Sequence, residues 1–129
     1  MAEVRTRLMY AARTTNGIDL VLADPPWPNK SASRSAAYET FDPYSLFDFD
    51  LRSVLEASFE RDERPRRTLV GVWTTNKPKF RSFVIDKLFP AWSLSHHTTF
   101  TWIKVAANGE PVYPLDGSGR RCYEGGTSA

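Results

Sequence analysis

Apolar runs and amphipathic stretches alternate through the middle of the chain. Residues 18–23 form an aliphatic run without helical period, which predicts a strand buried on both faces, as in a parallel sheet. Residues 68–75 and 93–105 are rich in β-branched and aromatic residues and predict two more strands. Between them, residues 46–61 and 78–89 carry apolar side chains at helical spacing and predict helices. This alternation predicts an α/β, Rossmann-like fold with a mostly parallel sheet.

Polar residues and prolines mark the ends of the predicted helices. Asp48 or Asp50 can cap the first helix, because a short carboxylate accepts hydrogen bonds from free backbone N–H groups. Asn76 is a candidate cap for the second helix, Pro78 suits its first turn, and Pro90 is expected to end it.

The first predicted strand ends in Asp24-Pro25-Pro26-Trp27. Proline has no amide hydrogen and restricts the residue before it, so the chain must leave the sheet here in a stiff turn. In open α/β sheets, ligands bind beyond the carboxyl ends of the strands. We therefore place the candidate site at this turn.

The tetrapeptide has the groups needed to hold an exocyclic amine such as that of adenine. The Asp24 carboxylate can accept one N–H and the Pro25 carbonyl the other, while the Trp27 ring can stack on an unstacked base. The same residues also form an ordinary strand-ending turn with the indole in the core. On the tetrapeptide alone, both interpretations stay open.

Residues 28–44 form a long polar segment in which Lys30 and Arg34 alternate with hydroxyl and aromatic side chains. Such a loop is unusual unless it is functional. We favour a gate over a nucleotide, and the alternative is a flexible connector.

Composition narrows the class of protein. The 129 residues are 41% hydrophobic, carry a net charge of +2 and include one cysteine, Cys122, which excludes an internal disulfide and a cysteine-based zinc site. No apolar segment is long enough for a membrane span or a signal peptide. His96 and His97 are adjacent on a predicted strand, so they point to opposite faces and cannot share a metal as a pair. Trp73 and Trp102 are interpreted as core residues.

Positive residues are grouped along the chain, although the net charge is small. Each group can contact phosphates, but a solvated surface is the commoner explanation. The groups are Lys30 with Arg34, Arg61 with Arg64, Arg66 and Arg67, Lys77 with Lys79 and Arg81, and Arg120 with Arg121.

Taken together, these motifs resemble the MT-A70 family of adenine-N6 methyltransferases, in particular its methyltransferase-like protein 4 branch. The resemblance is ordered and covers most of the chain from residue 18. The matching segments are Asp24 to Ser31, Ser33-Arg34-Ser35, Tyr38, Trp73 to Asn76, Leu88 to Ser93, Trp102 to Val105, Gly109-Glu110, Pro114 to Asp116 and Tyr123-Glu124-Gly125.

The resemblance implies transfer of a methyl group from S-adenosylmethionine to the adenine amine of DNA or RNA, without a metal, in the nucleus or else the cytoplasm, and not in a secreted protein. A partner subunit is also possible in this family. The implied catalytic residues are Asp24, Pro25, Pro26 and Trp27, the implied substrate-binding residues are Asn29, Lys30, Ser31 and Arg34, and the implied cofactor-binding residues are Asp24, Pro25 and Arg121. Arg121 stands where the family has a lysine, and Cys122 replaces a proline.

The resemblance also divides the chain. We expect a weakly structured segment over 1–17, a partial catalytic domain over 18–125, and a non-family tail without strand character over 126–129. The family continues with further strands and helices, so we expect weak or undetectable binding of S-adenosylmethionine to this chain. Two hypotheses follow: a methyltransferase segment, and an inactive nucleic-acid-binding or partner-binding remnant. A glutamine methyltransferase is disfavoured, because its motif begins with Asn and this one begins with Asp24.

Overall fold

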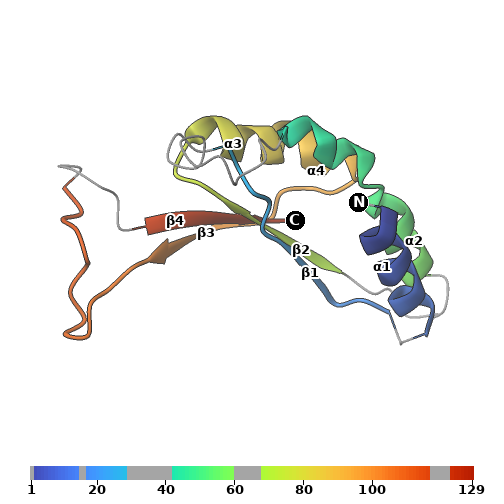
Figure 1. Cartoon of the computed structure of the whole chain (residues 1–129), viewed down its shortest axis with the longest axis horizontal. Coiled ribbons are helices and arrows are strands. Elements are labelled where there is room, and N and C mark those ends of the chain that lie inside the picture. Colours follow the sequence, from blue (N-terminus) through green and yellow to red (C-terminus); the bar gives the residue numbers. More distant parts are fainter. Residues whose placement is uncertain (1, 15–16, 29–41, 60–67, 117–122) are drawn as a thin grey trace.

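The computed structural model describes residues 2–14, 17–28, 42–59, 68–116 and 123–129 (Figure 1). The helical elements are α1 (Ala2–Thr14), the 3-10 helix η2 (Pro43–Asp48), α2 (Leu51–Phe59), α3 (Pro78–Phe83), the π-helical η3 (Val84–Leu88) and α4 (Phe89–Ala91). The strands are β1 (Leu20–Ala23), β2 (Leu69–Thr74), β3 (Thr98–Ile103) and β4 (Tyr123–Ser128).

The strands form one mixed sheet in the order β1-β2-β4-β3. β1 pairs parallel with β2, whereas β4 pairs antiparallel with both β2 and β3. The three predicted strands therefore run in one direction, which confirms the α/β class. The expectation of a mostly parallel sheet is wrong, because β4 lies between two of these strands and runs the opposite way.

The β4 strand also corrects the prediction of a tail without strand character. Its sequence is dominated by glycine and small polar residues, which carry no apolar alternation. Pairing on both sides supplies the backbone hydrogen bonds that stabilise it. A Cβ at Gly126 would lie 3.3 Å from the Trp73 ring, so a larger residue there would require that ring to shift. Thr127 and Ser128 are buried in the sheet.

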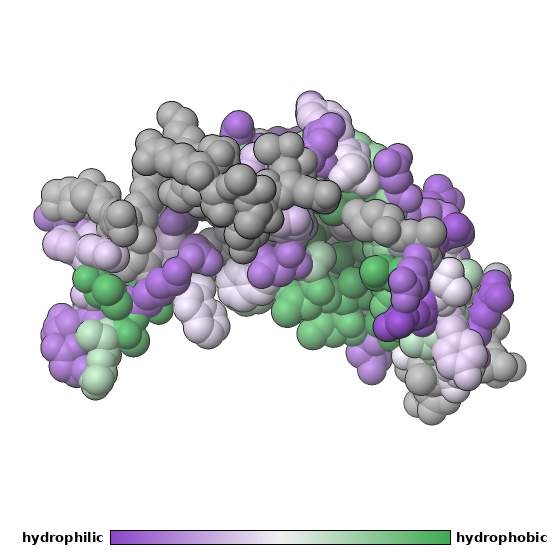
Figure 2. Space-filling model, in the orientation of Figure 1, coloured by the Kyte–Doolittle hydropathy of each residue, from purple (hydrophilic) through white to green (hydrophobic). Residues whose placement is uncertain are grey.

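The helices α2, α3, η3 and α4 cover one face of the sheet (Figure 1). The core between them and the sheet includes Val70 and Val72 of β2, which alternate with more exposed neighbours. β1 differs from the prediction of a strand buried on both faces, since Leu20 and Leu22 are 56% and 62% exposed. Figure 2 shows apolar side chains gathered over β1 and β2 on the face away from α3 and α4.

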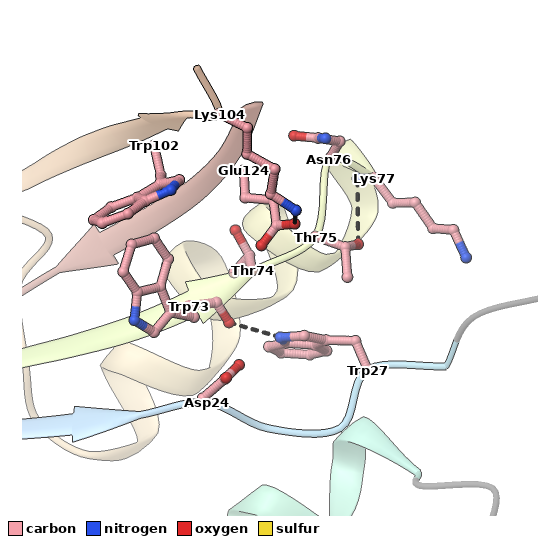
Figure 3. Close-up of a pocket in the computed structure, with 10 residues that line it drawn as sticks. All are labelled: Asp24, Trp27, Trp73, Thr74, Thr75, Asn76, Lys77, Trp102, Lys104 and Glu124. Carbon is pink, nitrogen blue, oxygen red and sulfur yellow. Dashed lines mark hydrogen bonds and ion pairs between the residues drawn. The ribbon is translucent and has the colours of Figure 1, made fainter. Parts of the chain in front are cut away.

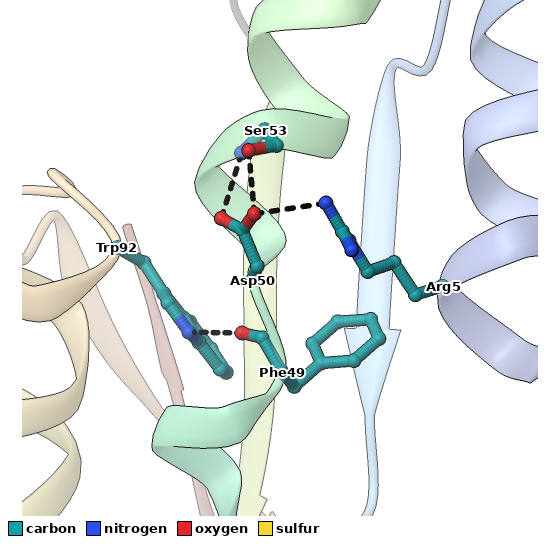
Figure 4. A network of polar contacts seen from close by, with 5 residues as sticks. All are labelled: Arg5, Phe49, Asp50, Ser53 and Trp92. Carbon is teal, nitrogen blue, oxygen red and sulfur yellow. Dashed lines mark hydrogen bonds and ion pairs between the residues drawn. The ribbon is translucent and has the colours of Figure 1, made fainter. Parts of the chain in front are cut away.

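The predicted weakly structured segment over residues 1–17 is mostly helix, which corrects that expectation. α1 packs against α2, and Leu8 and Met9 contact the core while Ala12 is fully buried. Arg5 of α1 forms an ion pair of 3.1 Å with Asp50 (Figure 4). Few apolar residues carry this contact, so the sequence pattern of the helix is weak.

The first predicted helix is divided into η2 and α2. Asp50 caps α2, because the Ser53 N–H and hydroxyl donate to its carboxylate at 3.2 and 2.5 Å (Figure 4). Both bonds lower the pKa of Asp50, and the bond from the Ser53 hydroxyl has the larger effect. The positive charge of Arg5 lowers this pKa further. The cap prediction is confirmed at Asp50.

The second predicted helix continues past Pro90, so the prediction that Pro90 ends it is wrong. α3, η3 and α4 follow one another without a break from Pro78 to Ala91. Pro90 lies in the first turn of α4, where a missing N–H is tolerated. The π turn before it shifts the hydrogen-bond register, so that the Phe89 N–H donates to the Val84 carbonyl.

Candidate active site

A pocket of about 520 Å³ opens where β1, β2 and β3 end (Figure 3). Its position agrees with the prediction, because the carboxyl ends of strands that run in one direction meet at the same edge of the sheet. Its volume falls in the range of about 300–1,000 Å³ that is usual for ligand pockets. The lining residues are Asp24, Trp27, Trp73, Thr74, Thr75, Asn76, Lys77, Trp102, Lys104 and Glu124.

Asp24 follows β1 directly and turns its carboxylate toward this space (Figure 3). The residue is exposed, and among the residues that the structure describes none donates a hydrogen bond to it. Its oxygens are therefore accessible to a ligand. A carboxylate is an acceptor of hydrogen bonds only, so this position suits a ligand that carries N–H groups.

The two prolines and Trp27 form a tight turn after Asp24. The Trp27 N–H donates to the Pro25 carbonyl at 2.8 Å, which closes a three-residue turn. Pro25 is buried and Pro26 is exposed. The Pro25 oxygen has a second lone pair, although Pro25 is not among the residues that line the pocket.

Trp27 lines the pocket, but most of its ring is buried, which favours the core interpretation over the predicted platform for a base. It is only 8% exposed and packs against Phe80 at 4.9 Å between ring centroids and edge-on against Phe83 at 6.4 Å. Its indole N–H donates to the Trp73 carbonyl at 2.6 Å. β1 ends at Ala23, which pairs with Val72, so no residue of β1 pairs with Trp73. The Trp27 indole N–H donates to the Trp73 carbonyl in place of a strand partner.

Trp73 and Trp102 were predicted to be core residues, and the structure places both in the pocket wall. Trp102 is 59% exposed, and the two rings meet edge-on with centroids 6.0 Å apart. The signal was available in the sequence of β2. Val72 and Thr74 flank Trp73 and face the helices, so the alternation of a strand directs the Trp73 indole to the opposite face.

Hydrogen bonds between the strands hold the rim of the pocket. The Thr74 hydroxyl donates to the Gly125 carbonyl at 3.1 Å, and the Asn76 amide donates to the Tyr123 carbonyl. Lys104 and Glu124 form an ion pair of 2.5 Å between β4 and the residue after β3. These contacts join the end of β2 to β4 and keep the pocket wall in place.

Lys77 connects the motif turn to the helix that follows β2. Its ammonium group donates to the Pro28 carbonyl at 3.0 Å and lies 5.6 Å from the centroid of the Phe80 ring. Lys77 also lines the pocket. From the sequence, Lys77 was identified only as one of a group of basic residues and not as a residue of the pocket.

Several predicted site residues fall outside the described residues: Asn29, Lys30, Ser31, Arg34 and Arg121. The proposed gate over residues 28–44 falls mostly there as well. Their roles stay predictions.

In the described part of the chain, no group of three or more His, Cys, Asp or Glu side chains is arranged to hold a metal ion. His96 and His97 lie just before β3, and the His96 ring is 3.1 Å from the Thr99 hydroxyl. No helix in the described ranges has the length and apolar character needed to cross a membrane.

Comparison with known proteins places this arrangement in a family. The chain is 32% identical over 106 residues to the mouse N(6)-adenine-specific methyltransferase METTL4, which covers 82% of this chain and 21% of the mouse protein. It is 30% identical over 126 residues to the N6-methyladenosine RNA methyltransferase MTA1 of Pyricularia oryzae, covering 95% of this chain and 32% of that protein.

A third relative, the DNA N6-methyl methyltransferase of Caenorhabditis elegans, is 30% identical over 98 residues, or 76% of this chain and 24% of the worm protein. The chain thus spans about a fifth to a third of the length of these relatives. The MT-A70 family profile matches residues 18–124, which include β1, β2, β3 and the pocket residues. The chain belongs to the MT-A70 family.

Proposed function

We propose that this chain carries the amine-holding part of a site that methylates the N6 atom of adenine in nucleic acid. The observation that supports this most strongly is an accessible carboxylate, Asp24, at the edge of a pocket that three tryptophans line. The family membership adds the reaction class, since relatives named as adenine methyltransferases match most of the chain. DNA and RNA both fit the proposal.

Asp24 is assigned to one N–H of the adenine amine. The nitrogen lone pair of this amine is delocalised into the ring, so the amine must be held by its hydrogens and turned toward tetrahedral geometry before it can attack. The exposed Asp24 carboxylate supplies one acceptor, and the Pro25 carbonyl, fixed by the Trp27 N–H, supplies the other.

Trp102, supported by Trp73, is assigned to the target base. An enzyme that reacts at a base must take that base out of the helical stack, and an aromatic ring compensates for the lost stacking. Trp102 is more than half exposed, whereas Trp27 is buried. The edge of Trp73 against the Trp102 ring limits the rotation of that ring.

The pocket residues fit S-adenosylmethionine, the methyl donor that the family implies. This donor is positively charged at sulfur and carries a purine ring, and the pocket offers the Asp24 carboxylate together with indole surfaces, while the Glu124 carboxylate is paired with Lys104. When bound, it supplies an electrophilic methyl group, so that a C–N bond forms at adenine, a C–S bond breaks, and the amine proton leaves to solvent or to a carboxylate. Asp24 holds the amine and need not be a strong base, because the nitrogen becomes acidic only as it is methylated.

The alternative is an inactive remnant that still binds nucleic acid or a protein partner. The short span of the chain relative to its relatives favours this alternative. The accessible Asp24 favours catalysis, because a binding module does not require a free carboxylate beside a base pocket. The proposed location is the nucleus, with the cytoplasm as the alternative, since nucleic acid is the substrate.

Transfer of a radiolabelled methyl group to a single-stranded, adenine-containing oligonucleotide tests the proposal, with S-adenosylmethionine at a concentration high enough to offset the weak binding that the sequence predicts. The product is digested to nucleosides and N6-methyladenine is identified by chromatography. We expect Asp24→Ala to lose nearly all transfer, about a hundredfold or more, because positioning and electrostatic stabilisation both depend on the carboxylate.

Asp48→Ala is the matched control, because Asp48 is an exposed aspartate in η2 that does not line the pocket. It should transfer the methyl group at the wild-type rate. Transfer that survives Asp24→Ala would overturn the role of Asp24. No transfer by the wild-type chain, under conditions in which it binds the oligonucleotide, would support the remnant instead.

A further inference from the structure

A basic ridge lies along α3 next to the pocket, and we propose that it binds the phosphates that flank the target base in a single strand of nucleic acid. The ridge is defined by Lys77, Lys79 and Arg81, at the start of α3. The inference rests on the proposed function, because that function requires a strand whose base enters the pocket.

The ridge begins at the pocket itself. Lys77 lines the pocket, and the Thr74-to-Lys77 segment is shared with a smaller cavity of about 280 Å³ on the other side of that segment. Arg81 lines this second cavity. A strand with its base in the pocket therefore has cationic side chains within reach of the adjoining backbone.

The second cavity has the chemistry of an anion site. Among the residues that the structure describes, its lining contains two cations, Lys77 and Arg81, and no carboxylate. The Thr74 hydroxyl and an Asn76 N–H already donate to backbone carbonyls, whereas hydroxyls such as that of Thr101 can donate hydrogen bonds to phosphate oxygens. The other polar groups of the lining are mostly hydroxyls and one amide. They are Thr74, Thr75, Asn76, Thr99, Thr101 and Tyr123.

The lysines of the ridge are held in place by aromatic contacts. The Lys79 ammonium group lies 4.9 Å from the centroid of the Phe80 ring, and that of Lys77 lies 5.6 Å from it. Lys79 also lines a groove of about 470 Å³ that continues past Pro28 toward Tyr44 and Lys87. Prior ordering of these long side chains lowers the entropy cost of binding a phosphate.

Two carboxylates line this groove and make it less favourable for binding phosphates. Asp42 and Asp86 line it together with Lys79 and Lys87, so its charge is mixed. On the other side of α3, no acidic side chain of the described residues lines the cavity beside Arg81. The phosphates are therefore assigned to the ridge itself and to the cavity beside Arg81.

Fluorescence anisotropy with a labelled single-stranded oligo(dT) tests the ridge. This oligonucleotide has no adenine, so its binding does not depend on the amine-holding site or on methylation. The variant is Lys79→Ala/Arg81→Ala, which leaves Lys77 and its contact with Pro28 intact.

We expect the variant to bind about tenfold more weakly at low salt, and the slope of log affinity against log salt to fall by about 0.7 for each lost phosphate contact. The control is Arg7→Ala/Arg52→Ala, which removes the same charge from exposed ion pairs on α1 and α2. Lys79→Arg/Arg81→Lys should restore binding, because it keeps both charges.

Equal losses of affinity in the variant and the control, or an unchanged salt slope in the variant, would refute the proposal that the ridge binds phosphates. The outcome is separate from that of the methylation test. Asp48→Ala, which changes an exposed aspartate outside the pocket, should bind oligo(dT) with wild-type affinity whether or not the proposed reaction is correct. Retained methylation by Asp24→Ala would refute the reaction and leave the binding result on the ridge intact.

Discussion

Exchanging Trp27 for phenylalanine separates a structural role from a base-stacking role. The ring stays aromatic, so a stacking platform would survive the change. The indole N–H that donates to the Trp73 carbonyl is lost. Leaving a partly buried carbonyl without its donor costs about 1–3 kcal/mol, and the smaller ring also packs less closely against Phe80. We therefore expect Trp27→Phe to destabilise the fold by about 1–3 kcal/mol.

Urea unfolding followed by circular dichroism measures this loss. With a dependence on urea of about 1–3 kcal/mol per molar, typical of small proteins, the midpoint should fall by roughly 1 M. Trp102→Phe is the matched control, because Trp102 is 59% exposed and its change should alter stability by less than about 0.5 kcal/mol.

Binding of an adenine-containing oligonucleotide should show the opposite order. Folded Trp27→Phe should bind like the wild type, whereas Trp102→Ala should lose about 1–3 kcal/mol, the usual value of one stacked base. A wild-type unfolding midpoint in Trp27→Phe would refute the structural role. Wild-type binding by Trp102→Ala would refute the assignment of the base to Trp102.

Two further predictions concern the packing around α2. The buried Ser58 hydroxyl accepts the Ile18 N–H at 2.7 Å, so Ser58→Ala should leave that N–H unpaired and cost about 1–3 kcal/mol in urea unfolding; an unchanged midpoint would contradict this. Asp50 has a folded-state pKa below its ordinary value of 3.8, so its carboxylate stabilises the fold above that pH, and the benefit is lost as the pH falls through the folded-state pKa. Asp50→Ala should therefore be less stable than the wild type at neutral pH, with a difference that shrinks below pH 3.8 in thermal unfolding; a difference that stays constant with pH would exclude the carboxylate as the cause.

The parts of the fold with a strong apolar signal could be predicted from the sequence. The runs that become β1 and β2 and the helical spacing in α2 and α3 are all set by burial against one core. The position of the site followed from the same pattern, because Asp24 had to lie where β1 ends. The Asp50 cap could also be predicted, because the carboxylate accepts a hydrogen bond from Ser53, only three residues along the chain.

The parts that failed depend on tertiary partners. β4 is held by pairing with β2 and β3, and its glycines carry no strand signal of their own. The helical segment that Pro90 was expected to end continues because a π turn before it shifts the hydrogen bonds. The exposure of Leu20 and Leu22 depends on what covers the sheet, which a strand pattern does not specify.

The burial of Trp27 and the exposure of Trp102 also depend on tertiary partners. Both are large and apolar, and composition cannot show which one faces a core. Trp27 is buried because α3 places Phe80 and Phe83 beside it. Trp102 is exposed because it lies on the sheet face away from the helices, at the edge strand β3.

The contact between Asp24 and the adenine amine is the central claim, and one binding measurement tests it without requiring turnover. Affinities are compared for an oligonucleotide with a single adenine and for the same oligonucleotide with unsubstituted purine, which lacks the amine. A hydrogen bond to a charged group is worth about 1.5–3 kcal/mol, so the wild-type chain should prefer adenine by about tenfold or more. Asp24→Ala should lose most of this preference, because only the Pro25 carbonyl then remains to accept from the amine, whereas a preference for adenine that is unchanged in Asp24→Ala would contradict the claim.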